Sequence, residues 1–455
     1  MNKFDLGIIG GGPGGYLAAE RAAQGGLKVV LWEKATLGGV CLNEGCMPTK
    51  TFLHSAKLYH QALNSAAYGV TVSGAVFDQA AVLRRKDQIV KALVNAVGVK
   101  MKNRQIEVIN APGIISEQTP EGFLVNDEIL CQRLIIASGS ETVKPNIPGL
   151  AEGLAAGHVL TNREILQVSQ LPQSLTVIGA GVSGLELAVY FAKVGVKVTV
   201  VELLDKIGGT LDGELAAALL KDLSKTIDFK LGYQVVKIDQ STLLAKKGED
   251  TIEISADKIF LSVGRRPVLD GTGHQNIRLY TEKGAIVTDE FLRTNIADVY
   301  AIGDVNGRSM LAHTAYREAE VAVNHILGKA DRIDYDTIPS VIYTTPEIAM
   351  VGDSEESAKA KGLNYSVKKL SMRYASRFMA ENQAQDGICK LLIDNNSQRL
   401  LGVHLLGSYV SEIIYGAALM LESRYPLKDL KKLVFPHPTV SEIIRETMFA
   451  EDWGD

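Results

Sequence analysis

The chain has 455 residues, 46% of them apolar and 22% charged, which are the proportions of a globular protein with a large core. Its 48 Lys and Arg nearly balance its 52 Asp and Glu, and a formal net charge of −4 without a basic block argues against a nucleic-acid-binding protein. No apolar run reaches the roughly 18 residues of a membrane helix, so we expect no membrane span. Four cysteines are too few for a secreted disulfide scaffold, and the first residues leave no room for a secretion signal, so we expect a cytoplasmic protein.

The first 33 residues predict a βαβ unit that binds a dinucleotide. Apolar runs over 4–9 and 28–32 predict strands, and residues 14–24 predict an amphipathic helix between them. The glycine-rich loop before this helix has the spacing G-x-G-x-x-G, which lets backbone N–H groups approach a pyrophosphate at the helix N-terminus. An acid at the end of the second strand would accept hydrogen bonds from ribose hydroxyls. The predicted binding residues are Gly10, Gly12, Gly15 and Glu33.

Cys41 and Cys46 are the most specific signal in the chain. On a regular helix they would be separated by roughly 7.5 Å of rise, whereas a disulfide tolerates Cα separations only up to about 6.8 Å. A bridge between them therefore needs an irregular backbone, which the flanking glycines allow. A helix predicted to begin at Pro48 would favour the thiolate of Cys46. The alternatives are buried structural thiols or half of a zinc site, but Cys131 and Cys389 lie inside apolar strand patterns, so we expect no metal site.

The βαβ pattern returns in the middle of the chain. A strand, a glycine loop, a helix and a second strand follow one another over residues 174–201 and end at an acid. The first glycine and the acid are 23 positions apart in both copies, so we expect two dinucleotide sites. The predicted binding residues of the second unit are Gly179, Gly181, Gly184 and Glu202.

The position of the cysteines indicates which cofactor belongs to which unit. Cys41 lies only eight residues beyond Glu33, beside the first dinucleotide. A nicotinamide passes a hydride and a disulfide accepts electrons as a thiolate pair, and a flavin can do both. We therefore expect FAD in the first unit and NAD in the second. Glu202 favours a 2′-hydroxyl over a 2′-phosphate and no arginine follows it, although Lys206 or a distant arginine could still bind the phosphate of NADP.

From about residue 338 the pattern changes to alternating strands and two helices without a phosphate loop, which predicts a separate α+β domain. His437 in this domain is flanked by prolines, and Glu442 lies in the first turn of a predicted helix. A carboxylate bound to one imidazole nitrogen fixes the tautomer and raises the basicity of the other, as a general base toward a dithiol requires.

The chain resembles the class I pyridine nucleotide-disulfide oxidoreductases. The stretch from Gly38 to Lys50, with both cysteines, is similar to the redox signature of that family, and its Cys-Leu-Asn sequence is most similar to the dihydrolipoamide dehydrogenase branch. The segments 301–305 and 310–313 are similar to the family's flavin-binding motifs, and 264–267 to its nicotinamide turn. The resemblance extends over nearly the whole chain. It implies FAD contacts at Lys50, Gly113, Ser138, Gly139, Asp304 and Ala312, and NAD contacts at Glu186 and Gly264.

The resemblance also implies roles for charged residues. Lys50 and Glu186 would form a pair by the flavin N5, with the lysine stabilising negative charge on the reduced ring. The motif His-Pro-Thr-x-Ser-Glu, which contains His437 and Glu442, is similar to the family's catalytic dyad. In that family each histidine serves the cysteines of the other subunit, so we expect a homodimer.

Together these features predict an α/β fold with two Rossmann-like dinucleotide-binding domains plus a C-terminal α+β dimerisation domain. We expect Cys41, Cys46, His437 and Glu442 to oxidise the dihydrolipoyl group of a lipoyl domain while NAD⁺ is reduced. The alternatives are a glutathione-type or mercuric-ion reductase, or a structural subunit of a dehydrogenase complex. Glutathione-type reductases usually carry arginines after the acid of the second unit, which is Glu202 here. Mercuric-ion reductases usually carry a C-terminal cysteine pair. This sequence has neither feature. The predicted domains are 1–146 (FAD), 147–268 (NAD), 269–337 (completing the FAD domain) and 338–455 (interface).

Overall fold

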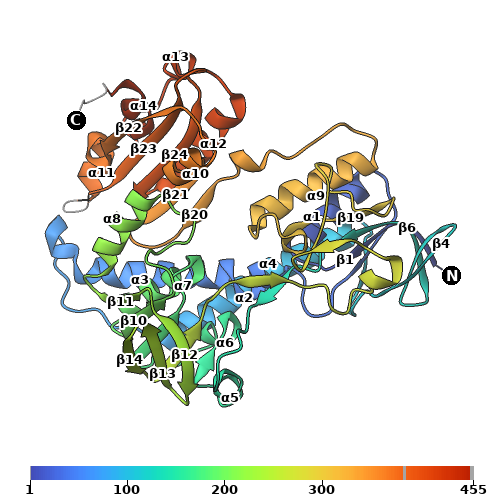
Figure 1. Ribbon diagram of the computed structural model, residues 1–455, viewed down its shortest axis with the longest axis horizontal. Coiled ribbons are helices and arrows are strands. Elements are labelled where there is room, and N and C mark those ends of the chain that lie inside the picture. The colour runs from blue at the N-terminus through green and yellow to red at the C-terminus, as the bar shows by residue number, and fades with distance from the viewer. Residues whose placement is uncertain (1, 383–385, 451–455) are drawn as a thin grey trace.

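The computed structural model describes residues 2–382 and 386–450, so the end of the predicted interface domain, 451–455, lies outside the described residues. The predicted fold class is confirmed. Two largely parallel sheets lie at the right and the lower left of Figure 1, and an antiparallel sheet built from the C-terminal part of the chain lies above them. Among the described helices, none is both long enough and apolar enough to cross a membrane.

The N-terminal sheet has the order β3-β2-β1-β6. These four strands and β19, which pairs with the end of β6, are parallel, whereas β5 and β4 continue the sheet in the antiparallel sense. Leu6 and Ile8 of β1 are fully buried, because helices cover the faces of a parallel sheet. The elements are β1 (Asn2–Ile9), α1 (Pro13–Gln24), β2 (Val29–Trp32), α2 (Gly39–Glu44), α3 (Cys46–Leu63), α4 (Gln79–Asn103), β3 (Glu107–Ile109), β4 (Ile115–Thr119), β5 (Gly122–Val125), β6 (Ile129–Ile136) and β7 (Ser140–Thr142). Later in the chain come β17 (Thr281–Glu282), β18 (Ala285–Ile286), β19 (Val299–Ala301) and α9 (Ala312–Ile326).

The second sheet repeats this arrangement. Its order is β11-β10-β9-β15, with β8 beyond β15, and every pair is parallel. The strand order therefore matches that of the first sheet, so the repeat in the sequence is also a repeat in topology. The elements of this part of the chain are α5 (Leu150–Ala155), β8 (Val159–Leu160), α6 (Asn162–Ile165), β9 (Ser174–Ile178), α7 (Val182–Lys193), β10 (Lys197–Glu202), α8 (Gly213–Leu223), β11 (Ile227–Leu231), β12 (Gln234–Asp239), β13 (Thr242–Lys247), β14 (Asp250–Ser255), β15 (Lys258–Leu261) and β16 (Arg265–Pro267). Of these, β12, β13 and β14 form a separate antiparallel sheet, and β16 pairs with β7.

The C-terminal sheet is antiparallel, with the order β20-β21-β24-β23-β22. The expectation of two helices here is wrong, because the described residues form α10 to α14. Three of these helices span only four to six residues, too few turns for a hydrophobic period to show in the sequence. The elements are β20 (Ser340–Ile342), β21 (Glu347–Gly352), α10 (Glu355–Ala360), β22 (Tyr365–Ser371), α11 (Ser376–Glu381), β23 (Ile388–Asp394), β24 (Leu400–Gly407), α12 (Val410–Ser423), α13 (Leu427–Leu430) and α14 (Glu442–Phe449).

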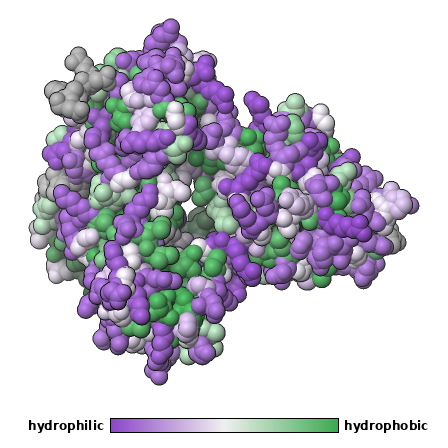
Figure 2. Space-filling view, viewed as in Figure 1, coloured by the Kyte–Doolittle hydropathy of each residue, from purple (hydrophilic) through white to green (hydrophobic). Residues whose placement is uncertain are grey.

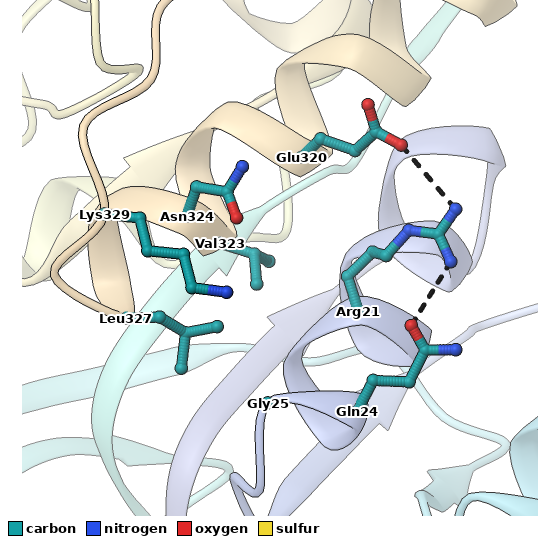
Figure 3. Close-up of a pocket in the computed structure, with 8 residues that line it drawn as sticks. All are labelled: Arg21, Gln24, Gly25, Glu320, Val323, Asn324, Leu327 and Lys329. Atoms are coloured by element: carbon teal, nitrogen blue, oxygen red, sulfur yellow. Dashed lines mark hydrogen bonds and ion pairs between the residues drawn. The ribbon is translucent and has the colours of Figure 1, made fainter.

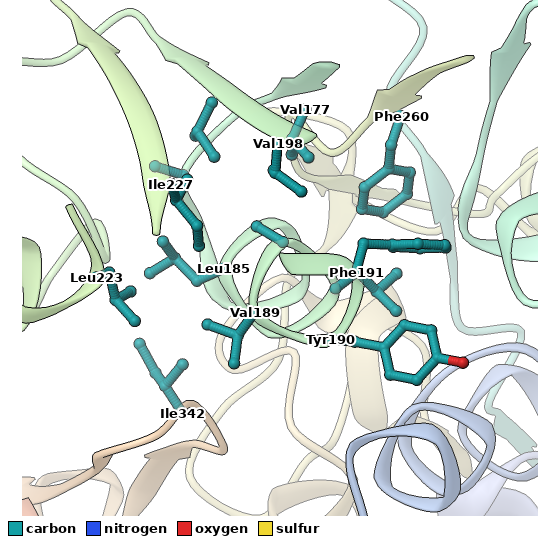
Figure 4. Close-up of a cluster of buried hydrophobic side chains, with 14 of the residues drawn as sticks. Val177, Leu185, Val189, Tyr190, Phe191, Val198, Leu223, Ile227, Phe260 and Ile342 are labelled. Carbon is teal, nitrogen blue, oxygen red and sulfur yellow. The ribbon is translucent and has the colours of Figure 1, made fainter. Parts of the chain in front are cut away.

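The three parts of the chain meet around α3 and α7. Phe52 of α3 stacks on Tyr190 of α7 with ring centroids 4.8 Å apart, and both rings belong to the apolar core of the second sheet. Ile342 of β20 belongs to the same core (Figure 4). The space-filling view shows a hollow where the parts converge, with apolar residues around it (Figure 2). This packing brings α7 and β20 to α3, the helix that begins at Cys46.

Candidate active site

Both glycine loops have the same strained turn. Gly10 and Gly179 have φ of 107° and 102°, and a Cβ on either would lie 2.3 Å from a backbone carbonyl oxygen. The third glycine of each motif is also required by the chain itself. A Cβ on Gly15 or Gly184 would lie 1.8 Å or 2.1 Å from the carbonyl oxygen of the first glycine. These four glycines therefore shape the loops.

The middle glycines, Gly12 and Gly181, are not explained by the protein's own packing. A Cβ on Gly181 would meet nothing within 4 Å, and one on Gly12 would make only an ordinary contact of 3.8 Å with Gly39. Both residues have ordinary backbone angles and directly precede α1 and α7, whose N-termini carry no side-chain cap. The space kept open there, in front of uncapped N–H groups, fits the phosphates of a dinucleotide.

The two predicted acids occupy equivalent places. Glu33 accepts a hydrogen bond from the Gly11 N–H (2.8 Å), and Glu202 accepts one from the Ala180 N–H (2.6 Å). Each carboxylate thus lies beside its own glycine loop at the end of a strand. This is where a ribose hydroxyl of a dinucleotide bound to the loop would reach it.

The other predicted flavin contacts line the neighbouring strand ends. Ser138 donates a hydrogen bond to the Val268 carbonyl (2.6 Å), and Asp304 accepts one from Ser140. Arg265, within the predicted nicotinamide turn 264–267, donates to the Ser140 hydroxyl and carbonyl at 2.7 Å each. The remaining predicted flavin contacts are Gly113, packed against Trp32, Gly139, with open space at its Cβ position, and Ala312, the first residue of α9. Gly264, predicted to contact NAD, also has open space at its Cβ position.

Cys41 and Cys46 lie on different helices. Cys41 is in α2 and Cys46 is the first residue of α3, with Gly45 (φ −146°, ψ −105°) breaking the helix between them. α3 thus begins two residues earlier than predicted, and the irregular backbone expected between the cysteines is present. Both residues are free thiols, joined by a hydrogen bond that lowers the pKa of Cys46 to about 7 and raises that of Cys41. Cys131 and Cys389 are fully buried, and the described residues hold no cluster of metal-ligating side chains.

Lys50 and Glu186 form an ion pair one helical turn beyond Cys46. The Lys50 ammonium lies 2.9 Å and 2.8 Å from the two carboxylate oxygens, and the Glu186 side chain is only 3% exposed. The positive charge of Lys50 favours the thiolate of Cys46, whereas burial and Glu186 oppose it. The ion pair therefore places a cation beside the thiol with the lowered pKa.

His437 and Glu442 also pair with each other, in the C-terminal part of the chain. The His437 Nδ1 lies 2.9 Å from Glu442 Oε1, and the Thr439 N–H donates to the other carboxylate oxygen, which lowers the pKa of Glu442. An ionised Glu442 holds the proton on Nδ1 and leaves Nε2 free to accept one. Within the described residues no hydrogen bond joins His437 to either cysteine, and its side chain is 71% exposed.

Comparison with known proteins agrees with this geometry. A family model for pyridine nucleotide-disulphide oxidoreductases matches residues 4–319, and a model for the dimerisation domain of the same family matches 338–448. The chain belongs to this family. Its sequence is 37% identical to mitochondrial dihydrolipoyl dehydrogenase of Pisum sativum over 99% of this chain and 91% of that one. It is 36% identical to dihydrolipoyl dehydrogenase of Bacillus subtilis over 99% and 98%. The flavoprotein disulfide reductase RclA of Escherichia coli superposes with a TM-score of 0.85 at 26% identity, covering 99% of both chains.

Membership of this family makes the protein a flavoprotein oxidoreductase that uses FAD and NAD(P). The dimerisation domain implies a homodimer. Both statements match the expectations from the sequence, whereas the substrate and the choice of nicotinamide cofactor need separate arguments.

Two tyrosines that were not predicted from the sequence lie near Cys41 in the structure. The hydroxyls of Tyr16, in the first turn of α1, and Tyr316, on α9, are hydrogen-bonded to each other, and both rings pack in one core with Leu42. Burial raises the pKa of both phenols, and the nearby Cys41 adds to the rise. Tyr16 directly follows Gly15, which was a usable signal, but nothing in the sequence marks Tyr316.

Two cavities lie outside the cysteine region. One of about 280 Å³ lies between the C-terminal halves of α1 and α9 and includes Arg21 and Glu320 (Figure 3), but none of the predicted site residues lines it. The other, of about 570 Å³, is lined by Ala35, Thr36 and Leu37 just beyond Glu33, and by Asn110 at the end of β3. Its place next to Glu33 fits the adenosine end of the first dinucleotide.

Proposed function

We propose that the protein is a dihydrolipoyl dehydrogenase that oxidises the dihydrolipoyl group of a lipoyl domain and reduces NAD⁺. Its end-to-end similarity to dihydrolipoyl dehydrogenases is the observation that carries this proposal. The His437–Glu442 pair supports the proposal. Oxidation of a dithiol needs a base to remove the thiol proton, whereas reduction of a metal ion by a flavin does not.

The residues have separate roles in this reaction. In the oxidised protein Cys41 and Cys46 form a disulfide, and one substrate thiol, deprotonated at His437 Nε2, attacks Cys41 and releases Cys46 as a thiolate. The second substrate thiol then attacks the sulfur bound to Cys41, releasing Cys41 and the cyclic lipoyl disulfide. The lowered pKa of Cys46 suits it as the leaving group of the first step, and Glu442 holds the imidazole in the required tautomer. The flavin, when bound, carries the electron pair from the dithiol to the nicotinamide.

The exposed position of His437 fits catalysis across a dimer. Because this side chain is open to solvent and not hydrogen-bonded to a cysteine of its own described chain, we propose that it serves the cysteines of the second subunit. A monomer would then be inactive.

The second unit suits NAD rather than NADP. Glu202 presents a carboxylate where a 2′-phosphate would bind. Lys206, the alternative that the sequence left open, donates to the Leu211 carbonyl (3.0 Å), and Lys247 nearby contacts Asp205 (3.1 Å). Both cations are therefore already engaged.

Steady-state kinetics test the proposal. We expect turnover of dihydrolipoamide with NAD⁺, and much slower reduction of glutathione disulfide or Hg²⁺ with either NADH or NADPH. Faster turnover of glutathione disulfide with NADPH would instead support the glutathione-type alternative and contradict the proposal.

A further inference from the structure

The Lys50–Glu186 pair is completed by a residue from the C-terminal sheet. Tyr343 directly follows β20, and its backbone N–H donates to Glu186 Oε1 (3.1 Å). The ammonium of Lys50 lies 4.4 Å from the centre of the Tyr343 ring, within the range of a cation–π contact. Three segments far apart in the sequence therefore converge on one buried carboxylate.

The segment that carries Tyr343 is fixed on both sides. Ile342 is 1% exposed and packs in the core of the second sheet (Figure 4). Thr344 is 2% exposed, and its hydroxyl donates to the Pro346 carbonyl (2.7 Å). The half-buried ring between them is therefore a rigid surface, whereas Lys50 has a long side chain that is 29% exposed and loses considerable freedom when it is held in one place.

The position of Lys50 matters because six charged or titratable groups of the described residues interact with Cys46. They are Cys41 from α2, Lys50 from α3, Glu186 from α7, Arg265 from β16, Tyr316 from α9 and Tyr343 itself. Lys50 and Glu186 act in opposite directions on the thiolate. A small movement of the ammonium away from Cys46 would therefore leave the carboxylate less compensated.

We propose that Tyr343 is a positioning residue that holds Lys50 beside Cys46 through its ring face and holds Glu186 through its backbone N–H. A residue of the C-terminal domain would thereby fix the two charged groups that act on the Cys46 thiol, although Cys46 belongs to the N-terminal part of the chain. This inference rests on the role proposed above for Cys46.

Alkylation of the reduced protein tests the role of the ring. We would treat the FAD-containing protein, reduced with dithiothreitol and desalted without oxygen, with iodoacetamide between about pH 5 and pH 9, and follow the Cys46 peptide by mass spectrometry. In Tyr343→Leu and Tyr343→Met, which lack the ring, the alkylation midpoint of Cys46 should move to higher pH, and the rate at neutral pH should fall about threefold. Tyr343→Phe, which keeps the ring, should behave like the parent protein. Tyr365→Leu, a substitution elsewhere in the same sheet, should have no effect.

A double-mutant cycle tests the route through Lys50. In a Lys50→Met background the Tyr343→Leu substitution should cause no further change at Cys46, because the group that it positions is gone. An unchanged midpoint in Tyr343→Leu and Tyr343→Met, an equal shift in Tyr343→Phe, or a shift that persists without Lys50 would each overturn the proposal. The assay measures alkylation and not turnover, and it needs neither dihydrolipoamide nor a nicotinamide, so a wrong substrate assignment would not affect its outcome.

Discussion

Cys41 and Cys46 share a hydrogen bond although each belongs to a different helix. Cys46 is at the N-terminus of α3 and near Lys50, and both features favour a thiolate. Cys41 supplies the proton of the hydrogen bond, so this bond and then burial raise its pKa, although Lys50 acts in the opposite direction. The two thiols are therefore chemically distinct although they are hydrogen-bonded to each other.

This difference predicts the effect of removing the donor at Cys41. Hydrogen bonding from Cys41 is the largest cause of the lowered pKa of Cys46, which is about 7. In Cys41→Ala the thiolate of Cys46 should form at a pH higher by about one unit, as measured by its ultraviolet absorbance. Cys41→Ser, which keeps a donor, should stay closer to the parent protein. Identical titrations of the Ala and Ser variants would contradict this account of the pair.

Catalysis across the dimer predicts complementation. Dimers of Cys41→Ser alone and of His437→Gln alone should each lose at least about 100-fold in turnover of dihydrolipoamide. In a mixed dimer, one site combines both defects and the other has neither, so about half of the activity per dimer should return. Separately tagged subunits, refolded together and purified through both tags, would provide the sample. No recovery in the mixed dimer would place His437 and Cys41 of the same chain in one site.

The glycine loops predict opposite effects of the same substitution at two positions. The Cβ that Gly181→Ala adds has no protein atom within 4 Å, so the free energy of unfolding should change by less than about 0.5 kcal/mol. The KM for the nicotinamide cofactor should rise about tenfold, because the methyl group occupies the space in front of the helix N-terminus. Gly184→Ala would place its Cβ 2.1 Å from the Gly179 carbonyl oxygen, and should lower the free energy of unfolding by about 2 kcal/mol or more. Urea unfolding and steady-state kinetics on both variants check this. A stable Gly184→Ala variant would contradict the close approach.

A buried ion cluster joins the second unit to the C-terminal sheet. Lys390 of β23 is 1% exposed and contacts Asp212 (3.0 Å), Glu214 (3.3 Å) and Glu355. Lys390→Met should lower the free energy of unfolding by about 3–5 kcal/mol, because it leaves carboxylates without their cation. Lys369→Met removes an exposed partner of Glu214 and should cost less than about 1 kcal/mol.

The same cluster has a defined pH dependence. Burial opposes ionisation of Asp212, but Lys390 outweighs it and lowers the pKa of Asp212. A carboxyl group whose pKa is lower in the folded than in the unfolded protein stabilises the fold at pH values above its unfolded-state pKa, which is near 4. This stabilisation disappears as the pH falls through the pKa of the folded protein. The difference in stability between the parent protein and Lys390→Met should therefore shrink below about pH 4. Urea unfolding at several pH values would show it, and a difference that grows in acid would contradict the sign.

The sequence by itself determined what depends on local backbone geometry. Glycine spacing located both loops, since Gly10 and Gly179 adopt turns that the chain itself requires, and Glu33 and Glu202 follow at equal distances. Gly45 explains the break between Cys41 and Cys46. These features arise within a few residues of one another, so a short motif is enough to predict them.

Only the tertiary structure decided which distant groups share a site. Tyr343 lies next to Lys50 because the C-terminal sheet packs on the core of the second unit, and Tyr316 meets Tyr16 because α9 packs on α1. The Lys390 cluster likewise needs two domains in contact. Such contacts depend on the free energy of packing between surfaces separated by many residues, and they leave no periodic or short-range pattern in the chain.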